Sequence, residues 1–131
     1  LGIFNGELNV PEDFDAALSV LVGHFVSRDQ RHTYYQNIIA RIRKDGIFVN
    51  TEISYDLESK HLSSMVKNWE KVQSLMGANP ESLASLPQVL KEVLSVLSHQ
   101  EVEKLLQQSG ISLPVLFFQS FMISGWYGFK V

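Results

Sequence analysis

Two side chains at the ends of apolar stretches have the chemistry to act on a small molecule. His24 follows an almost unbroken apolar run over residues 14–23, and an imidazole that titrates near neutral pH can orient a substrate or serve as a base. The structural alternative is a half-buried histidine that packs on the next helix. Glu52 lies near the end of the β-branched stretch 47–53 and could face a substrate, although a carboxylate at a strand end is more often solvated or a helix partner.

The other titratable side chains favour structural roles. His32, His61 and His99 lie on separate segments without the spacing that a metal site requires, so no metal is predicted. Five basic residues gather in one stretch, at Arg28, Arg31, Arg41, Arg43 and Lys44. Such a cluster could touch a phosphate-bearing substrate, but it is more often the wet face of a helix, with cations favoured near the helix C-terminus.

Composition narrows the class of protein. The 131 residues, 45% of them hydrophobic, suffice for one domain with a core. The net charge of −3 provides no broad basic field, which disfavours a nucleic-acid partner. The longest strongly apolar run, residues 114–123, falls far short of the roughly 20 residues of a membrane helix. The absence of cysteine and of a signal-type start fits an intracellular, cytoplasmic protein.

The first half of the chain predicts a strand, a helix and a second strand. The run 14–23 suits a strand that is buried on both faces, as in parallel sheets. Ser27 and Gln30 have capping-box spacing, and tyrosine and isoleucine then recur at helical spacing up to Ile42. Gly46 is expected to end this helix, and residues 47–53 form the next strand, which a right-handed crossover would place parallel to the first.

The second half predicts helices followed by a hairpin. Helical periodicity covers residues 57–76 and 86–108, with a break at 77–80. Ser98 and Glu101 form a capping box, and Ser109 and Gly110 end the last helix. The aromatic tail, residues 113–131, is typical of two strands about a short turn. The fold class is therefore α/β, with a helical insert and a C-terminal antiparallel hairpin.

The order of these pieces resembles the C-terminal half of the class I S-adenosylmethionine-dependent methyltransferases, which have a Rossmann-like sheet. Asn-Gly-Glu at 5–7, Phe-Asp-Ala at 14–16 and Lys-Asp-Gly at 44–46 precede the helices and the hairpin in that order. The resemblance covers residues 1–131, from the third strand onward, with the helical insert at about 57–108. The segment 116–121 is similar to the bacterial enzymes that make carboxy-S-adenosylmethionine, and to related small-molecule methyltransferases.

The resemblance implies a cofactor site and a substrate site. Glu7 would accept a hydrogen bond from the adenine amino group, which suits an acceptor-only carboxylate, and the backbone of Leu8 would add a second contact. Val22 and Gly23 would lie against the methionine part of the cofactor at the carboxyl end of a strand, where open α/β sheets bind ligands. His24 is the candidate catalytic residue. Substrate contacts are expected from Glu52 and from Phe118, although Phe118, like Trp69 and Trp126, also suits core packing.

Part of the family pattern is absent from this sequence. No G-x-G-x-G motif occurs, so the glycine-rich turn that holds most of the cofactor is missing. In the family the first strand pairs with the fourth, and its loss would leave the strand at 14–22 with an open apolar edge. Open edges recruit partners. We therefore expect a homodimer through this edge, and weak or no binding of S-adenosylmethionine by the chain alone.

Two functions follow from these observations. The first is a fragment of a methyltransferase whose intact parent transfers a methyl group to a small molecule or a nucleoside; the fragment alone would be inactive. The second is a non-catalytic, degenerate methyltransferase-like module for protein interaction or dimerisation, because a fold does not guarantee a function. The sequence of about 100 residues encoded upstream of Leu1 would separate them. A G-x-G-x-G motif after a strand there would favour the enzyme.

Overall fold

The computed structural model describes residues 13–131. Glu7, Leu8 and the strand expected before them lie outside the described residues. The elements in chain order are β1 (Phe14–Val20), a 3-10 turn η1 (Gly23–Phe25), α1 (Arg28–Ile39), β2 (Ile42–Ile53), α2 (Leu62–Leu75), α3 (Pro80–Gln88), a π-helical turn η2 (Val89–Val93), α4 (His99–Gln108), β3 (Val115–Ser120) and β4 (Ile123–Phe129).

The four strands form one mixed sheet with the order β1-β2-β4-β3. β1 and β2 are parallel and are joined through α1, which confirms the predicted strand-helix-strand unit. β3 and β4 form the predicted antiparallel hairpin, and β4 inserts between β2 and β3. The α/β class is confirmed, and the parallel pair places the carboxyl ends of β1 and β2 at the same end of the sheet.

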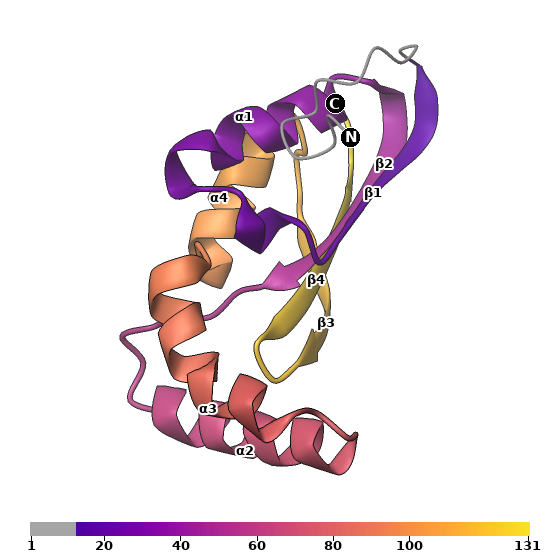
Figure 1. The fold of residues 1–131 in the computed structure, drawn as a ribbon. Helices are drawn as coiled ribbons and strands as arrows, with labels where there is room; N and C mark the ends of the chain where they lie inside the picture. The colour runs from indigo at the N-terminus through magenta and orange to yellow at the C-terminus, as the bar shows by residue number, and fades with distance from the viewer. Residues whose placement is uncertain (1–12) are drawn as a thin grey trace.

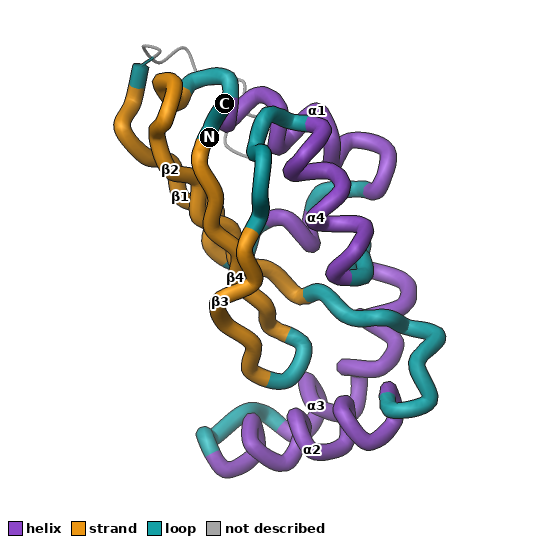
Figure 2. The backbone as a smooth tube through the Cα atoms, turned by 180° about the vertical axis from the view of Figure 1, so that it is seen from behind, coloured by secondary structure: helices purple, strands orange, loops and turns teal. Residues whose placement is uncertain are grey.

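One face of the sheet is covered by helices (Figures 1 and 2). α1 and α4 lie against it, and the main core forms between them and the sheet around Tyr35, Phe48 and Trp126, all at most 1% exposed. No helix among residues 13–131 covers the opposite face. We call that opposite side the outer face of the sheet.

The predicted burial of both faces of the first strand is wrong for this chain. Leu18 is 69% exposed and Val20 is 57% exposed, whereas Ser19 between them is buried. Within residues 13–131, β1 pairs only with β2, so β1 is an edge strand as expected from the missing neighbour. Side chains alternate across a strand, and only the side that meets α1 is covered. Ser19 lies on that side, with its hydroxyl 2.7 Å from that of Tyr34.

The observed helix ends match the ends predicted from the sequence at α4 but not at α1. Ser98 and Glu101 form the predicted capping box, and Gly110 follows α4 with φ +113°. At α1 the Ser27 side chain makes no capping hydrogen bond. Gly46 does not end that helix either. It lies inside β2, where a Cβ atom would come within 2.3 Å of the Ile42 side chain, so close packing explains this glycine.

The helical insert has its own small core. In this core, Trp69 of α2 and Leu90 of η2 are buried together with Val96 and Met122. The sequence favoured packing roles for Trp69 and Trp126, and both are buried, at 8% and 0% exposed. Across residues 13–131 there is no helix with the length and apolar character needed to cross a membrane.

Candidate functional site at the carboxyl ends of β1 and β2

A tight turn follows β1 and brings the predicted residues to the strand ends. Leu21 has a left-handed backbone with φ +56°, and its amide donates to the Thr51 carbonyl of β2 over 2.8 Å. The 3-10 turn then buries Gly23 and His24 while Phe25 stays 61% exposed. The left-handed residue turns the chain from the sheet toward α1, so the turn is anchored to β2 before the helix begins.

His24 is a buried, neutral anchor of this turn. The side chain is 3% exposed, and its Nδ1 accepts a hydrogen bond of 3.0 Å from the Ile53 amide of β2. Burial, together with the nearby positive charge of Arg31, lowers the pKa of His24 to about 4. Because its pKa is low and its Nδ1 lone pair already accepts from the Ile53 amide, the imidazole is a weak base at pH 7. This geometry favours the packing alternative for His24.

Glu52 is buried and paired, so it is not a solvated strand-end carboxylate and does not face an open substrate space. It is 0% exposed and forms an ion pair with Arg31, which is equally buried. Its carboxylate also accepts hydrogen bonds from the Tyr35 hydroxyl and, over 2.8 Å, from the Asn50 amide. The buried charge is thus compensated by one cation and two neutral donors.

Arg31 is buried, so the prediction of a solvent-exposed basic cluster is wrong for this residue, whereas Arg28, Arg43 and Lys44 are exposed. The Arg31 guanidinium donates to the Val26 carbonyl over 3.1 Å and to the Ser95 carbonyl over 2.5 Å. The Ser95 amide in turn donates to the His24 carbonyl over 2.9 Å. One buried guanidinium therefore ties α1, the turn after β1 and the segment before α4 to Glu52 on β2. We call Arg31, Tyr35, Asn50 and Glu52 the buried network.

The Tyr35 hydroxyl has a shifted pKa, and the Asn50 side-chain oxygen lacks a hydrogen-bond partner. Burial, with the adjacent Glu52 carboxylate, raises the pKa of the Tyr35 hydroxyl well above its usual value, so Tyr35 stays a donor. The Asn50 side-chain oxygen is buried without a hydrogen-bond partner, although its amide nitrogen donates to Glu52. An unpaired buried oxygen is costly, and here it lies beside a fully paired ion pair.

Gly23 is explained by the buried network. A Cβ atom at this position would lie 2.8 Å from Oε1 of Glu52 and 3.2 Å from the Tyr35 hydroxyl. The space a side chain would need is therefore filled from inside the protein. Val22 packs against the main core and is half-buried. The Glu52 carboxylate fills the space beside Gly23 on the inner side of the turn. A ligand could therefore approach Gly23 only from the outer side.

The other predicted substrate residue lies elsewhere. Phe118 is on β3, 45% exposed, and is paired in register with Gly125 of β4. Two strands, β2 and β4, separate β3 from β1 in the sheet. The structure brings Gly23, His24 and Glu52 together and does not bring Phe118 to them.

An open hollow of about 540 Å³ lies next to this site. Arg28, at the start of α1, and Tyr55, just after β2, line it together with Glu101 of α4. Arg28 and Glu101 form an exposed ion pair across two helices. Burial raises the pKa of Glu101, but hydrogen bonds from Ser98 and the charge of Arg28 lower it overall. The hollow is therefore charged at Arg28 and Glu101, and Tyr55, Leu57 and Val96 give it apolar surface as well.

Sequence reasoning missed Arg31, Tyr35 and Asn50 as parts of one site. Two signals could have revealed them. Asn50 and Glu52 are polar residues two apart in a β-branched strand, which places both on one face. Arg31 and Tyr35 are four apart on a helix and also share a face. Two polar pairs on neighbouring elements indicate that they meet in the interior.

Solved structures with a similar fold span almost the whole chain. A candidate O-methyltransferase from Nostoc punctiforme matches with a TM-score of 0.62 and 13% identity, over 96% of this chain and 34% of that one. An S-adenosylmethionine-dependent methyltransferase from Thermotoga maritima matches with a TM-score of 0.63 and 14% identity, over 97% and 61%. The 1,6-didemethyltoxoflavin-N1-methyltransferase of Burkholderia thailandensis, bound to 1,6-didemethyltoxoflavin and S-adenosylhomocysteine, matches with a TM-score of 0.59 and 20% identity, over 96% and 48%. This chain has a methyltransferase fold.

The methyltransferase fold confirms the resemblance inferred from the sequence at the level of architecture. The chain spans about a third to three fifths of the lengths of these structures. No protein-family model matches the sequence, and no curated protein matches it significantly. The narrower likeness to the enzymes that make carboxy-S-adenosylmethionine stays a prediction.

Proposed function

We propose that this chain is part of an S-adenosylmethionine-dependent methyltransferase that transfers a methyl group to a small-molecule or nucleoside acceptor. The observation that carries the proposal is the match of nearly the entire chain to methyltransferase structures. One of them holds S-adenosylhomocysteine together with a small heterocyclic substrate. The parent would be cytoplasmic, as the cysteine-free sequence suggests.

The described strand ends fit one side of the cofactor. Leu21 and Phe25 are 43% and 61% exposed and form an apolar wall beside Val22 and Gly23. Among residues 13–131, the buried donors at this end are already paired within the protein, as Arg31 and Tyr35 show. We therefore expect the groups that hold the adenine outside the described residues, where Glu7 and Leu8 are our candidates, and those that hold the ribose in the rest of the parent. The chain alone is expected to bind the cofactor weakly or not at all.

In this proposal the described residues hold the turn after β1 in place and help to position the methyl acceptor. S-adenosylmethionine supplies an activated methyl group when bound, so orientation of the acceptor carries much of the rate. The buried network holds the turn after β1 in one geometry, through Arg31 to the Val26 carbonyl and through His24 to the Ile53 amide. His24 is then a positioning residue for the turn, and its low pKa argues against a role as a strong base. The acceptor would occupy the hollow lined by Arg28, Tyr55 and Glu101.

Calorimetric titration with S-adenosylhomocysteine tests this function. The full-length protein in which the chain occurs is expected to bind it, and the 131-residue chain to bind it far more weakly. The variant Lys67→Gln, on the exposed face of α2, serves as a folded control that should bind like the wild type. Failure of the full-length protein to bind S-adenosylhomocysteine would contradict the proposal.

The outer face of the sheet supports a second candidate, a non-catalytic module that dimerises or binds another protein. Leu18, Val20, Phe117 and Phe129 are each more than half exposed, and β1 has an unpaired edge among the described residues. Exposed apolar patches and free edges recruit partners. Light scattering of the 131-residue chain should then show a dimer that the Leu18→Lys variant converts to a monomer. A wild-type monomer at high concentration would exclude the homodimer.

A further inference from the structure

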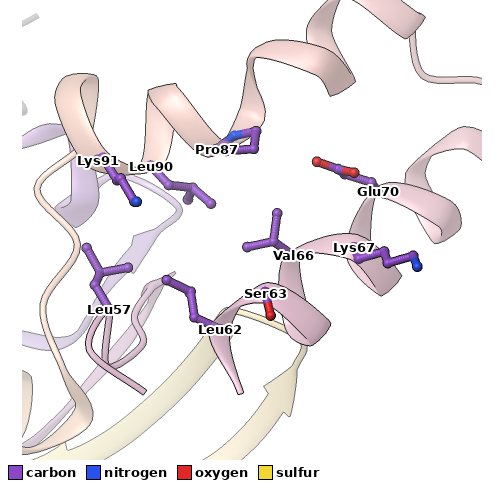
Figure 3. A pocket seen from close by; sticks show the side chains of 9 residues that line it. All are labelled: Leu57, Leu62, Ser63, Val66, Lys67, Glu70, Pro87, Leu90 and Lys91. Atoms are coloured by element: carbon purple, nitrogen blue, oxygen red, sulfur yellow. The ribbon is translucent and has the colours of Figure 1, made fainter. Parts of the chain in front are cut away.

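A separate pocket lies in the helical insert, between α2 and the α3–η2 segment (Figure 3). Its volume is about 340 Å³. Its lining includes the apolar residues Leu62, Val66 and Leu90 and the charged residues Lys67, Glu70 and Lys91. None of them belongs to the buried network or to the turn after β1. The function proposed above does not use this pocket.

The floor of the pocket is apolar and its shape follows from an irregular helix. Leu62 and Val66 from α2 and the buried Leu90 from η2 face the cavity. Pro87 lacks an amide proton and crowds the turn before it, and the chain continues as a π-helical turn in which the Leu94 amide donates to the Val89 carbonyl. Such turns are frequent at functional sites.

Two opposite charges flank this apolar floor. In Figure 3 the Lys91 ammonium group points toward the space beside Leu57 and Leu62, and the Glu70 carboxylate points toward Pro87 at the other end. Lys67 extends away from the cavity. The ion pairs found within residues 13–131 include none of these three side chains. Each end of the pocket therefore carries a charge that no protein group neutralises.

We propose that this pocket binds a small organic acid with an apolar body. The carboxylate would pair with Lys91, the apolar body would pack on Leu62, Val66 and Leu90, and a hydroxyl or amine at the far end would donate to Glu70. The volume lies at the small end of the range of ligand sites, about 300–1,000 Å³. A few placed polar groups around an apolar lining are typical of such sites.

A titration of the 131-residue chain with 4-hydroxybenzoate, followed by amide NMR shifts, tests the site. The probe has a carboxylate and a hydroxyl at opposite ends of a ring. Shifts should be confined to residues 62–70 and 87–91. Lys91→Gln should weaken binding about threefold to tenfold. The matched control Lys71→Gln makes the same charge change on an exposed side chain of α2 that does not line the pocket, and it should leave the affinity within about twofold.

Glu70→Gln and the analogue benzoate test the far end. Benzoate lacks the hydroxyl, so the wild type should prefer 4-hydroxybenzoate, and Glu70→Gln should lose that preference while it retains benzoate binding. Equal weakening by Lys91→Gln and Lys71→Gln would show attraction to surface charge only and would overturn the proposal. Absence of shifts at 62–70 and 87–91 would overturn it as well.

Discussion

The two faces of the sheet differ most near the carboxyl ends of β1 and β2. Toward the helices, β1 and β2 present Ser19, Asn50 and Glu52, all at most 3% exposed. Toward solvent, β1 presents Leu18 and Val20 at more than half exposure. A half-buried sheet normally places apolar residues inside and polar residues outside. At this end of the sheet the covered face therefore carries a polar network beside the apolar core of Phe48 and Trp126, whereas the open face carries apolar side chains.

From this difference we infer that the outer face is covered in the proposed parent. Strand register aligns Leu18 with Val49, Val49 with Tyr127, and Tyr127 with Val115, which gives an apolar row across all four strands. Parallel strands with apolar residues on both sides belong to sheets with helices on both faces. The described residues then supply the sheet and one helical layer. The opposite layer would come from the rest of the proposed parent.

The largest expected effect comes from breaking the buried ion pair on the covered face. Glu52→Gln leaves the Arg31 guanidinium buried without a counter-charge, because Arg31 is 0% exposed. We expect the free energy of unfolding to fall by about 3–5 kcal/mol. Urea denaturation measures it. The double variant Arg31→Met/Glu52→Gln should recover part of the loss, and additive losses would show that the two charges are not coupled.

Two phenylalanines on paired strands compare the faces directly. Phe48 is 1% exposed on the covered face, whereas Phe129 is 52% exposed on the outer face. Phe48→Ala should lower the free energy of unfolding by about 3–5 kcal/mol, and Phe129→Ala by less than about 1 kcal/mol. Equal losses in urea denaturation of the monomeric chain would mean that the outer face is already packed.

Two glycines provide a finer comparison. A Cβ atom at Gly23 would meet Oε1 of Glu52 at 2.8 Å, and one at Gly125 would meet the Thr51 methyl group at 3.1 Å and the Phe117 ring at 3.3 Å. Gly23→Ala should cost about 1–3 kcal/mol in the free energy of unfolding, because the buried network cannot move aside. Gly125→Ala should cost less, since Phe117 is exposed. The reverse order in thermal and urea unfolding would contradict this assignment.

The smallest effect concerns the pH dependence of stability through His24. Its pKa falls from 6.5 to about 4 on folding, so the unfolded chain binds more protons between these values. The contribution is fully present above pH 6.5 and is lost as the pH falls toward 4; after screening it is on the order of 1–2 kcal/mol. His24→Asn keeps an acceptor for the Ile53 amide and removes the titration. Its stability should therefore vary less with pH than that of the wild type over this interval, and identical profiles would contradict the assignment.

The sequence predicted local features better than long-range ones. The capping box at Ser98 and Glu101 and the aromatic hairpin depend on neighbours in the chain, and both formed. The strand at 14–20 was correct as an element, but its burial depends on a layer that residues 13–131 do not provide. Arg31 and Glu52 were interpreted as surface charges. Their ion pair joins two elements that are 21 residues apart in the sequence, so neither residue alone reveals it. The structure brings Gly23, His24 and Glu52 together at the strand ends, and their contacts are with the protein interior. Their roles toward a cofactor or a substrate stay proposals.

Hydrogen exchange on the full-length protein, with and without S-adenosylhomocysteine, tests the central claim most directly. We predict that the ligand protects the amides of residues 21–25 at the end of β1 and leaves those of α2 and α3 unchanged. Residues 14–20 should already exchange more slowly in the full-length protein than in the 131-residue chain, because the outer face is covered there. Unchanged exchange at residues 21–25 under saturating ligand would contradict a cofactor site at this end of the sheet.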